Sequence, residues 1–402
     1  MPKPLNLTFG IEFECIVSFD PTTYKPALHA AEGILWEKKV SSLLHEESKL
    51  CILFREHLVH LLRANGFPTY DVTSAGGNQK WTVSHDTSID IKDGPRSQDG
   101  FLECDIEITS PAMRFCPKAL RRVQHVIRTL TKHLDVSVNP SCGLHVHVGN
   151  QKAGFPLQTL KHFCILTALF EYQLNSLHPA HRIGNCHAKG PSAAFKGHDL
   201  WDTVRAIQGC ETEEELVLLY ADKEDRPDRC FAYNLCPMVF GSNKTIEFRQ
   251  HEGTLEWSEI MNWVQVAGGM VDAMHDISSF GLAQLIGTCA FDPRFSVSDL
   301  LRRLRLKALV PYYSGHLHMH QRPEPVRVRG GIEGNVEGVP HGRHAVSGWN
   351  ELERRHKFEK LEELERLRML AKRHELERRR ERARQNEAID ARRATSEYEG
   401  EE

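Results

Sequence analysis

The chain has 402 residues and a formal net charge of −3, with 40% hydrophobic and 26% charged residues. This length suits one large enzyme domain with an appendage, and the composition is that of a globular protein. The absence of a basic excess argues against a general nucleic-acid-binding protein. We find no signal segment at the start and no apolar run of membrane-spanning length, so we expect a cytoplasmic protein without a membrane partner.

Cysteine usage bears on the redox environment. The eleven cysteines include no CxxC pair, which favours a reducing cytoplasm over a secreted disulfide framework. We expect Cys104, Cys116, Cys142 and Cys164 to be small buried residues rather than metal ligands.

The first predicted element is a β-strand in NLTFGIEFECIV, residues 6–17. Its odd positions are apolar from Leu7 to Cys15, whereas Glu12 and Glu14 share the opposite face. Residues 30–65 then predict a helix that ends at Gly66.

Three later segments repeat this division into an apolar and a charged face: LECDIEITSP from residue 102, CGLHVHVG from 142 and TIEFRQHEGT from 245. Their charged faces carry Glu103, Asp105, Glu107, His145, His147, Glu247 and Arg249. Because lysine is nearly absent from these faces, we expect one cavity floored by an antiparallel sheet rather than four solvent-facing surfaces.

Helical periodicity fills the intervals between these strands. It predicts helices over 117–134 and 156–177, each starting at a proline, and over 256–274. Thr212 and Glu215 have capping-box spacing at the start of a further helix over 212–220. No dinucleotide or P-loop phosphate-binding motif occurs.

The composition changes sharply towards the C-terminus. We predict a folded body over 1–310, a disordered linker rich in Pro, Gly and His over 311–348, a charged helix over 349–395 and an acidic tail over 396–402. The helix has a short apolar stripe whose three-residue spacing drifts off a heptad. A solvated helix with i,i+4 ion pairs is favoured over a weak coiled coil that binds itself or a protein partner.

Electrostatics constrains what such a cavity holds. Clustered carboxylates repel one another and would be partly protonated at neutral pH unless a cation neutralises them. Oxygen-rich sites suit Mg²⁺ or Mn²⁺, and His145 could add a nitrogen ligand. Arg249 beside divalent ions suits phosphate oxygens, which favours phosphoryl transfer over peptide hydrolysis.

At these residues the sequence resembles the amidoligase family. FGIEFE, ECDIEITSP, SCGLHVHVG and TIEFRQHEGT occur in the family's order within residues 6–275. The family is part of the carboxylate–amine ligase superfamily, with glutamine synthetase and glutamate–cysteine ligase. The resemblance implies an α+β fold: a curved antiparallel sheet whose concave face holds ATP and divalent ions, with helices on the convex face.

The resemblance also implies roles for single residues. The metal ligands would be Glu12, Glu14, Glu107, His145 and Glu247, with Glu103 as a possible further ligand. Arg249 would stabilise the transferred phosphoryl group, and His147 would lie beside substrate or phosphates. Asp86 resembles a residue of the family's amine site, although Thr87 replaces the glycine of that turn. Arg182, Arg229 and Asn234 are candidates for nucleotide or substrate contacts.

The implied reaction forms an amide between small-molecule or peptide substrates. A carboxylate attacks the γ-phosphoryl group of ATP to give an acyl phosphate, and an amine then displaces phosphate. Two alternatives stay open: a zinc-dependent hydrolase that uses the two histidines and the carboxylates, and a non-catalytic scaffold that keeps the fold.

Overall fold

The computed structural model describes residues 2–24, 39–40, 42–43, 46–72, 79–91, 101–221, 226–290, 292 and 294–318. The chain divides into two units, 1–329 and 330–402, and all described residues belong to the first. The predicted C-terminal helix, acidic tail and most of the linker lie outside the described residues. Their structure and any role in binding a partner stay predictions.

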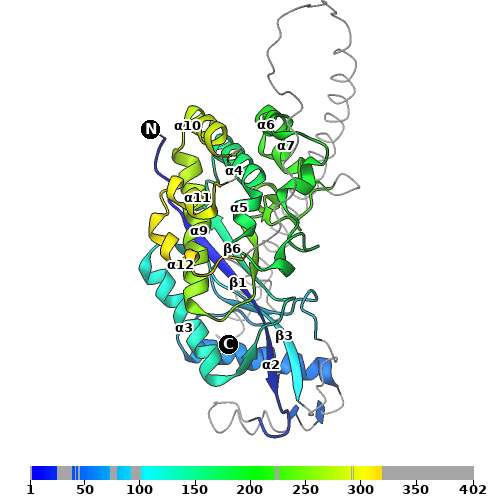
Figure 1. Cartoon of the computed structure of the whole chain (residues 1–402). Helices are drawn as coiled ribbons and strands as arrows, with labels where there is room; N and C mark the ends of the chain where they lie inside the picture. Colours follow the sequence, from blue (N-terminus) through cyan, green and yellow to red (C-terminus); the bar gives the residue numbers. More distant parts are fainter. Residues whose placement is uncertain are drawn as a thin grey trace, which may run out of the picture. The chain divides into compact units, whose positions relative to one another are not determined.

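The centre of the first unit is a curved, open antiparallel sheet (Figure 1). Its strand order is β2-β3-β1-β6-β8-β7, and the short strands β4 and β5 also pair with β1. The strands are β1 Thr8–Phe19, β2 Thr82–Ser84, β3 Leu102–Thr109, β4 Met113–Arg114, β5 Asp135–Ser137, β6 Gly143–Gly149, β7 Tyr233–Asn234 and β8 Thr245–Glu252. The four strands predicted from alternation are therefore confirmed as β1, β3, β6 and β8.

The alternation of side chains gives this sheet one apolar and one polar face. Phe9, Ile11 and Phe13 of β1 are buried on the apolar face, as are Ile106 of β3 and Val146 of β6. These side chains belong to one continuous core with the helices. Burial of this face is the main stabilising contribution that the sheet makes.

Helices pack against the apolar face and against one another. Helix α2 contacts β2 and β3, and α9 runs along β6 and packs on α4 (Figure 1). The α-helices are α2 Glu47–Ala64, α3 Pro117–His133, α4 Leu157–Leu169, α5 Glu171–Asn175, α6 Leu200–Gly209, α7 Glu213–Leu218, α8 Cys236–Val239, α9 Trp257–Asp276, α10 Ser279–Leu285, α11 Val297–Arg303 and α12 Val310–Ser314. Short 3₁₀ turns are η1 Ala180–Arg182, η2 Pro191–Phe195 and η4 Lys307–Leu309, and η3 Ile286–Ala290 is a π-turn.

Several helix predictions need refinement. Helix α3 begins at Pro117 as predicted, but the helix predicted over 156–177 breaks at Phe170, which caps both α4 and α5. Thr212 caps α7 by accepting from the Glu215 N–H. The Glu215 carboxylate accepts from the Glu211 N–H rather than from Thr212, so the predicted capping box is half formed. Helix α12 overlaps the first residues of the linker that was predicted over 311–348.

The prediction for Cys104 as a simple buried residue is wrong in one respect. Cys104 of β3 is buried, but it forms a disulfide with Cys51 of α2 across 5.6 Å between their Cα atoms. The spacing of 53 residues gave no sequence signal for this pair, because only the packing of α2 on β3 brings the two together. Cys142 and Cys164 are free and buried as predicted, while Cys116 is free and half-buried.

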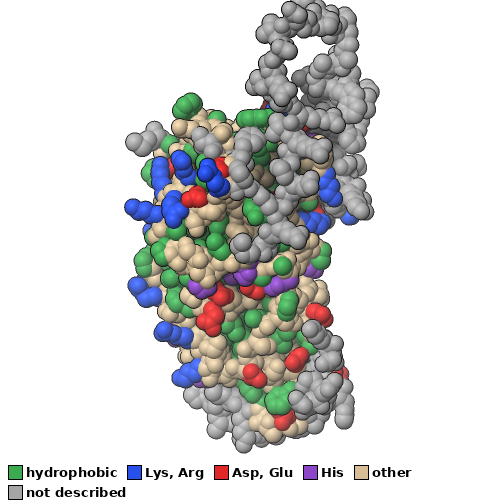
Figure 2. Space-filling view, viewed as in Figure 1, with side chains coloured by type: hydrophobic (Ala, Val, Ile, Leu, Met, Phe, Trp, Pro, Cys, Tyr) green, Lys and Arg blue, Asp and Glu red, His purple; other side chains and the backbone are tan. Residues whose placement is uncertain are grey.

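Titratable side chains are unevenly spread on the surface. On the face shown in Figure 2, histidines run in a band across the middle, with acidic side chains beside it. Among the described helices, none has both the length and the apolar composition that a bilayer crossing requires.

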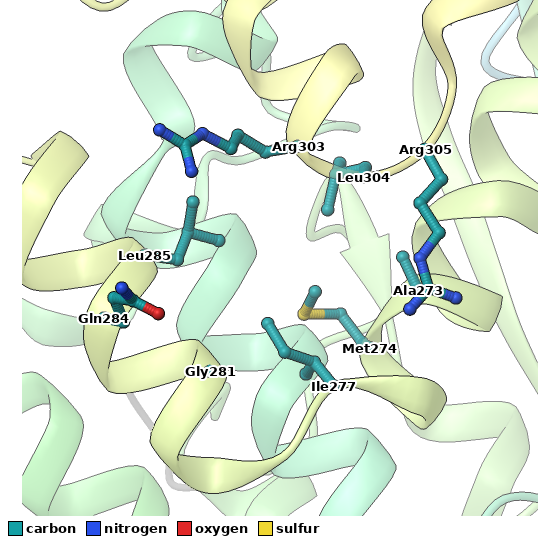
Figure 3. A pocket seen from close by; sticks show the side chains of 9 residues that line it. All are labelled: Ala273, Met274, Ile277, Gly281, Gln284, Leu285, Arg303, Leu304 and Arg305. Atoms are coloured by element: carbon teal, nitrogen blue, oxygen red, sulfur yellow. The ribbon is translucent and has the colours of Figure 1, made fainter.

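A cavity of about 180 Å³ opens between the ends of α9, α10 and α11 (Figure 3). Its lining combines Met274, Ile277 and Leu285 with Arg303 and Arg305, and Arg305 is paired with Asp276 at 2.9 Å. None of the residues predicted to form the functional site lines this cavity.

Candidate metal centre on the polar face of the sheet

Strand register assembles the predicted site on the polar face. Across the strands, Glu107 is opposite Glu14, Glu12 is opposite His145, and His147 is opposite Glu247. Asn234 of β7 extends the row beyond Glu247. Four strands that are distant in sequence, with β7, therefore place these side chains in one row.

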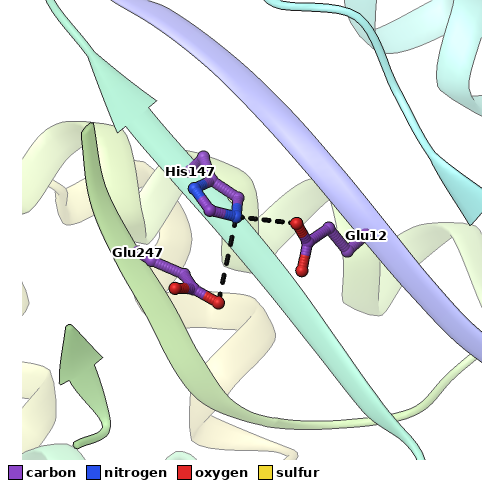
Figure 4. Close-up of side chains that lie close together, drawn as sticks. All are labelled: Glu12, His147 and Glu247. Atoms are coloured by element: carbon purple, nitrogen blue, oxygen red, sulfur yellow. Dashed lines mark hydrogen bonds and ion pairs between the residues drawn. The ribbon is translucent and has the colours of Figure 1, made fainter. Parts of the chain in front are cut away.

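The middle of the row is a group of three possible metal ligands. Glu12, His147 and Glu247 each offer one ligand atom, and these atoms all lie within 4.8 Å of one another (Figure 4). His147 Nε2 lies 3.0 Å from a Glu12 oxygen and 3.9 Å from a Glu247 oxygen. The other ring nitrogen, Nδ1, lies 3.1 Å from the Thr245 hydroxyl, which fixes the plane of the imidazole.

Glu247 is held from two further directions. The Asn234 amide donates to one of its carboxylate oxygens at 2.6 Å, and Arg249 Nη1 donates to the other. Arg249 also donates from Nε to the His187 carbonyl at 3.2 Å. Because Glu247 and Arg249 are two residues apart on β8, they share the polar face, as the sequence predicts.

Glu14 and His145 form a more deeply buried corner of the site. Glu14 is 3% exposed and accepts a hydrogen bond from the Gly143 N–H at 2.6 Å. His145 lies between the two acids of β1, with Nδ1 3.1 Å from Glu12 and Nε2 3.4 Å from Glu14. Gly143 leaves the room for this contact, since a Cβ there would lie 2.8 Å from His145 Nε2.

The acidic side chains of β3 contact hydroxyl groups and an arginine rather than histidines. Glu107 accepts from Thr109 at 3.0 Å and from Ser84 at 3.3 Å. Asp105 pairs with Arg55 of α2 at 3.0 Å and accepts from the Asp86 N–H at 3.0 Å. Asp105 therefore fixes the turn that carries Asp86.

The pKa shifts follow from these neighbours. Burial acts to raise the pKa of Glu12, but His147 and His145 outweigh it and hold the pKa well below its usual value. Burial acts to lower the pKa of His147, but Glu12 and Glu247 raise it to about 9. Burial and the charge of Glu12 raise the pKa of Glu107 to about 7. Burial also raises the pKa of Glu14.

The donor set fits a divalent cation. Two carboxylates and an imidazole can all bind such an ion, and the carboxylates favour a hard one. Glu12 and Glu247 favour the charged form of His147 and raise its pKa, so a metal ion would compete with a proton for this group. The sequence resemblance implies His145 as a metal ligand and His147 beside substrate or phosphates. The three ligand atoms that lie together belong to His147, Glu12 and Glu247, but His145 Nδ1 also lies 3.1 Å from Glu12 and 3.8 Å from Glu247, so both histidines adjoin the two acids.

The remaining predicted residues differ in position. Asp86 is half-buried, and its charge acts on both Glu14 and Glu107. Arg182 is buried and donates to backbone carbonyls of β8. Glu103 lies opposite Ser18, four residues along β1 from Glu14, so the structure does not bring it into the row. Arg229 is exposed on a turn.

Sequence reasoning missed several supporting residues. Thr245 precedes Glu247 by two positions, so the period of two already placed it on the polar face. Gly143, Ser84 and Arg55 carry no comparable signal, because their contacts depend on strand register and on the packing of α2.

The fold and site together define a class: a protein whose open antiparallel sheet presents a cluster of carboxylates, imidazoles and an arginine that can hold a divalent cation. Residues 5–271 match the family described as putative amidoligase enzyme, and the chain belongs to this family. The match includes every residue of the row. Among proteins with curated functions, none matches the chain.

Proposed function

We propose that the chain is an ATP-dependent ligase that joins a carboxylate to an amine through an acyl phosphate, with Mg²⁺ or Mn²⁺. The observation that carries the proposal is the convergence of Glu12, His147 and Glu247 beside Arg249. The family name supports a ligase. The curved antiparallel sheet with its polar face supports a glutamine-synthetase-like architecture.

Each residue of the row has a proposed role. Glu12, His147 and Glu247 would hold a divalent cation, which would supply positive charge to screen the phosphate groups of the nucleotide. Glu14, Glu107 and His145 are proposed as ligands of further ions. Arg249 donates hydrogen bonds to the oxygens of the transferred phosphoryl group, where negative charge is concentrated. Asn234 donates a hydrogen bond to Glu247 and thereby holds this carboxylate in place near the proposed nucleotide site.

The proposed reaction has two steps. A substrate carboxylate oxygen attacks the γ-phosphorus of ATP, and the bond to the ADP oxygen breaks. The amine nitrogen then attacks the acyl carbon, the carbon–oxygen bond to phosphate breaks, and Asp86 accepts the proton released from the amine. Hydrogen bonds from Ser88 oppose burial and keep the pKa of Asp86 below its usual value, so Asp86 is negatively charged at neutral pH and would attract the ammonium form of the amine substrate. The substrates are proposed to be small molecules or peptides in the cytoplasm.

The test is ADP release measured with Mg²⁺ or Mn²⁺ against pooled carboxylates and amines. We expect release that requires metal, a carboxylate and an amine, and that is lost in Glu247→Ala. Glu256→Ala is the matched control, because Glu256 is exposed at the start of α9. Folded protein without ADP release in any mixture would contradict the proposal. Tightly held zinc with nucleotide-free hydrolysis would favour a hydrolase, and no stabilisation by Mg²⁺ and ATP would favour a scaffold.

A further inference from the structure

Strand β8 changes its register against β6 beside Arg249. Val146 is opposite Phe248 and His147 is opposite Glu247, but Leu144 is opposite His251 and Gly143 is opposite Glu252. Between Phe248 and His251, β8 therefore has one more residue than β6 has between Leu144 and Val146. Such a bulge interrupts the ladder of hydrogen bonds and re-aims the side chains next to it.

A buried arginine satisfies the backbone at this bulge. Arg182 is 2% exposed. Its Nη2 donates to the Arg249 carbonyl at 2.7 Å and its Nε donates to the Gln250 carbonyl at 3.2 Å. Leaving a buried carbonyl without a partner is costly, so the two hydrogen bonds from the guanidinium stabilise the irregular backbone at the bulge.

The loop that supplies Arg182 also holds the Arg249 side chain. The His187 carbonyl accepts from Arg249 Nε at 3.2 Å. Asn185 closes the loop by donating to the His181 carbonyl at 3.2 Å and accepting from the His187 N–H at 2.8 Å. One loop therefore contacts Arg249 at two points, its carbonyl through Arg182 and its guanidinium through His187.

The space for Arg182 depends on Gly143. A Cβ at residue 143 would lie 3.1 Å from Arg182 Nη2 and 3.3 Å from a Glu14 oxygen. The guanidinium thus lies between the bulge and the Glu14 corner, and the negative charge of Glu14 opposes the desolvation that lowers the pKa of Arg182. The Arg182 guanidinium donates its hydrogen bonds to backbone carbonyls of β8.

We propose that Arg182 is a positioning residue: it holds the β8 bulge and thereby fixes the Arg249 guanidinium beside Glu247. The expected effect of Arg182 on catalysis rests on the proposed function, whereas the positioning of Arg249 by Arg182 does not. Arg182 acts through Arg249 and does not contact the nucleotide.

The experiment is a double-mutant cycle on ADP release, with Arg182→Gln and Arg249→Met alone and together. We expect Arg182→Gln to lower kcat by about 10²-fold, the effect of a misplacement of about 1 Å, with little change in the KM for MgATP. In the Arg249→Met background, the same substitution should lower the residual rate by less than about threefold, because the residue it positions is already absent. Arg182→Lys, which can still donate to one carbonyl, should give an intermediate rate.

Arg121→Gln is the matched control, since Arg121 is exposed on α3. If Arg182→Gln does not fold, Arg182→Lys is carried through the same cycle. A raised KM for MgATP with unchanged kcat, or effects that multiply in the double mutant, would overturn the proposal.

A crystal structure of the folded Arg182 variant separates this inference from the proposed function. We expect Arg249 displaced from Glu247 whether or not the wild-type protein releases ADP. An unchanged Arg249 in that structure would overturn the positioning role, whereas a displaced Arg249 in a protein without ADP release would contradict the ligase proposal alone.

Discussion

Histidines on the two sides of the sheet have pKa values that are shifted in opposite directions. On the polar face, Glu12 and Glu247 overcome burial and raise the pKa of His147 to about 9. Towards the core, burial lowers the pKa of His57 in α2 and of His251 in β8 to about 4. His57 is surrounded by Phe54 and Tyr24, and His251 by Trp263 and His178. Burial alone therefore does not set the pKa of His147, because Glu12 and Glu247 outweigh it.

On the polar face, the substitution with the largest expected effect is Glu12→Gln, which removes the carboxylate that both His145 and His147 contact. We expect the affinity for Mn²⁺, measured by calorimetry with the metal alone, to fall by about 10²-fold or more. ADP release should fall at least as far, because the Gln amide is a weaker ligand and brings no negative charge. An unchanged Mn²⁺ affinity would show that Glu12 does not hold the ion.

A smaller effect is expected at the β3 end of the row, where Glu107 accepts hydrogen bonds from the hydroxyl groups of Thr109 and Ser84. Glu107→Gln should weaken Mn²⁺ binding by less than about tenfold, because Glu107 lies outside the group of Glu12, His147 and Glu247. The same calorimetry measures it, with Glu12→Gln as the reference. Equal losses in the two variants would place Glu107 among the ligands of the tightest-bound ion.

The lowered pKa of His57, on the core side of the sheet, is tested through the pH dependence of the unfolding free energy. Below pH 6.5 the unfolded chain protonates His57, whereas the folded state keeps it neutral down to about pH 4. The unfolded state then binds more protons, so the unfolding free energy falls as the pH is lowered through this window.

We expect His57→Gln to remove up to about 3 kcal/mol of that pH-dependent loss, measured by urea unfolding at pH 7 and pH 4.5. His198→Gln, at an exposed position, is the control. Equal pH dependence in wild type and His57→Gln would contradict a neutral buried His57.

Alternation predicted which faces carry chemistry, and the family resemblance named residues expected to share one site, but neither gave the strand register that sets their contacts. Alternation is a local property, so Glu12 and Glu14 could be placed on one face of β1 from residues 6–17 alone. Their partners depend on register, and a shift of one residue would move every side chain to the other face. The bulge at Arg249 is therefore invisible in the alternation, and so is the role of Arg182, which needs the loop and β8 to be packed together.

Contacts between side chains of a helix and a strand could not be predicted from the sequence either. Arg55 sits on a predicted helix face and Asp105 on a predicted polar strand face, and either could have met solvent. Their ion pair exists because α2 packs across β3, which the spacing of apolar residues indicates only in general terms. Glu103 shows the converse: it shares the face of Glu107, yet it lies too far along the strand to join the site.

The Cys51–Cys104 bond also has a consequence for the backbone between its two ends. Hydrolysis of one peptide bond anywhere between residues 51 and 104 leaves two fragments that remain covalently joined, and a reductant releases them. A nicked chain would therefore keep the strand with Glu12 and the strand with Glu107 in a single molecule.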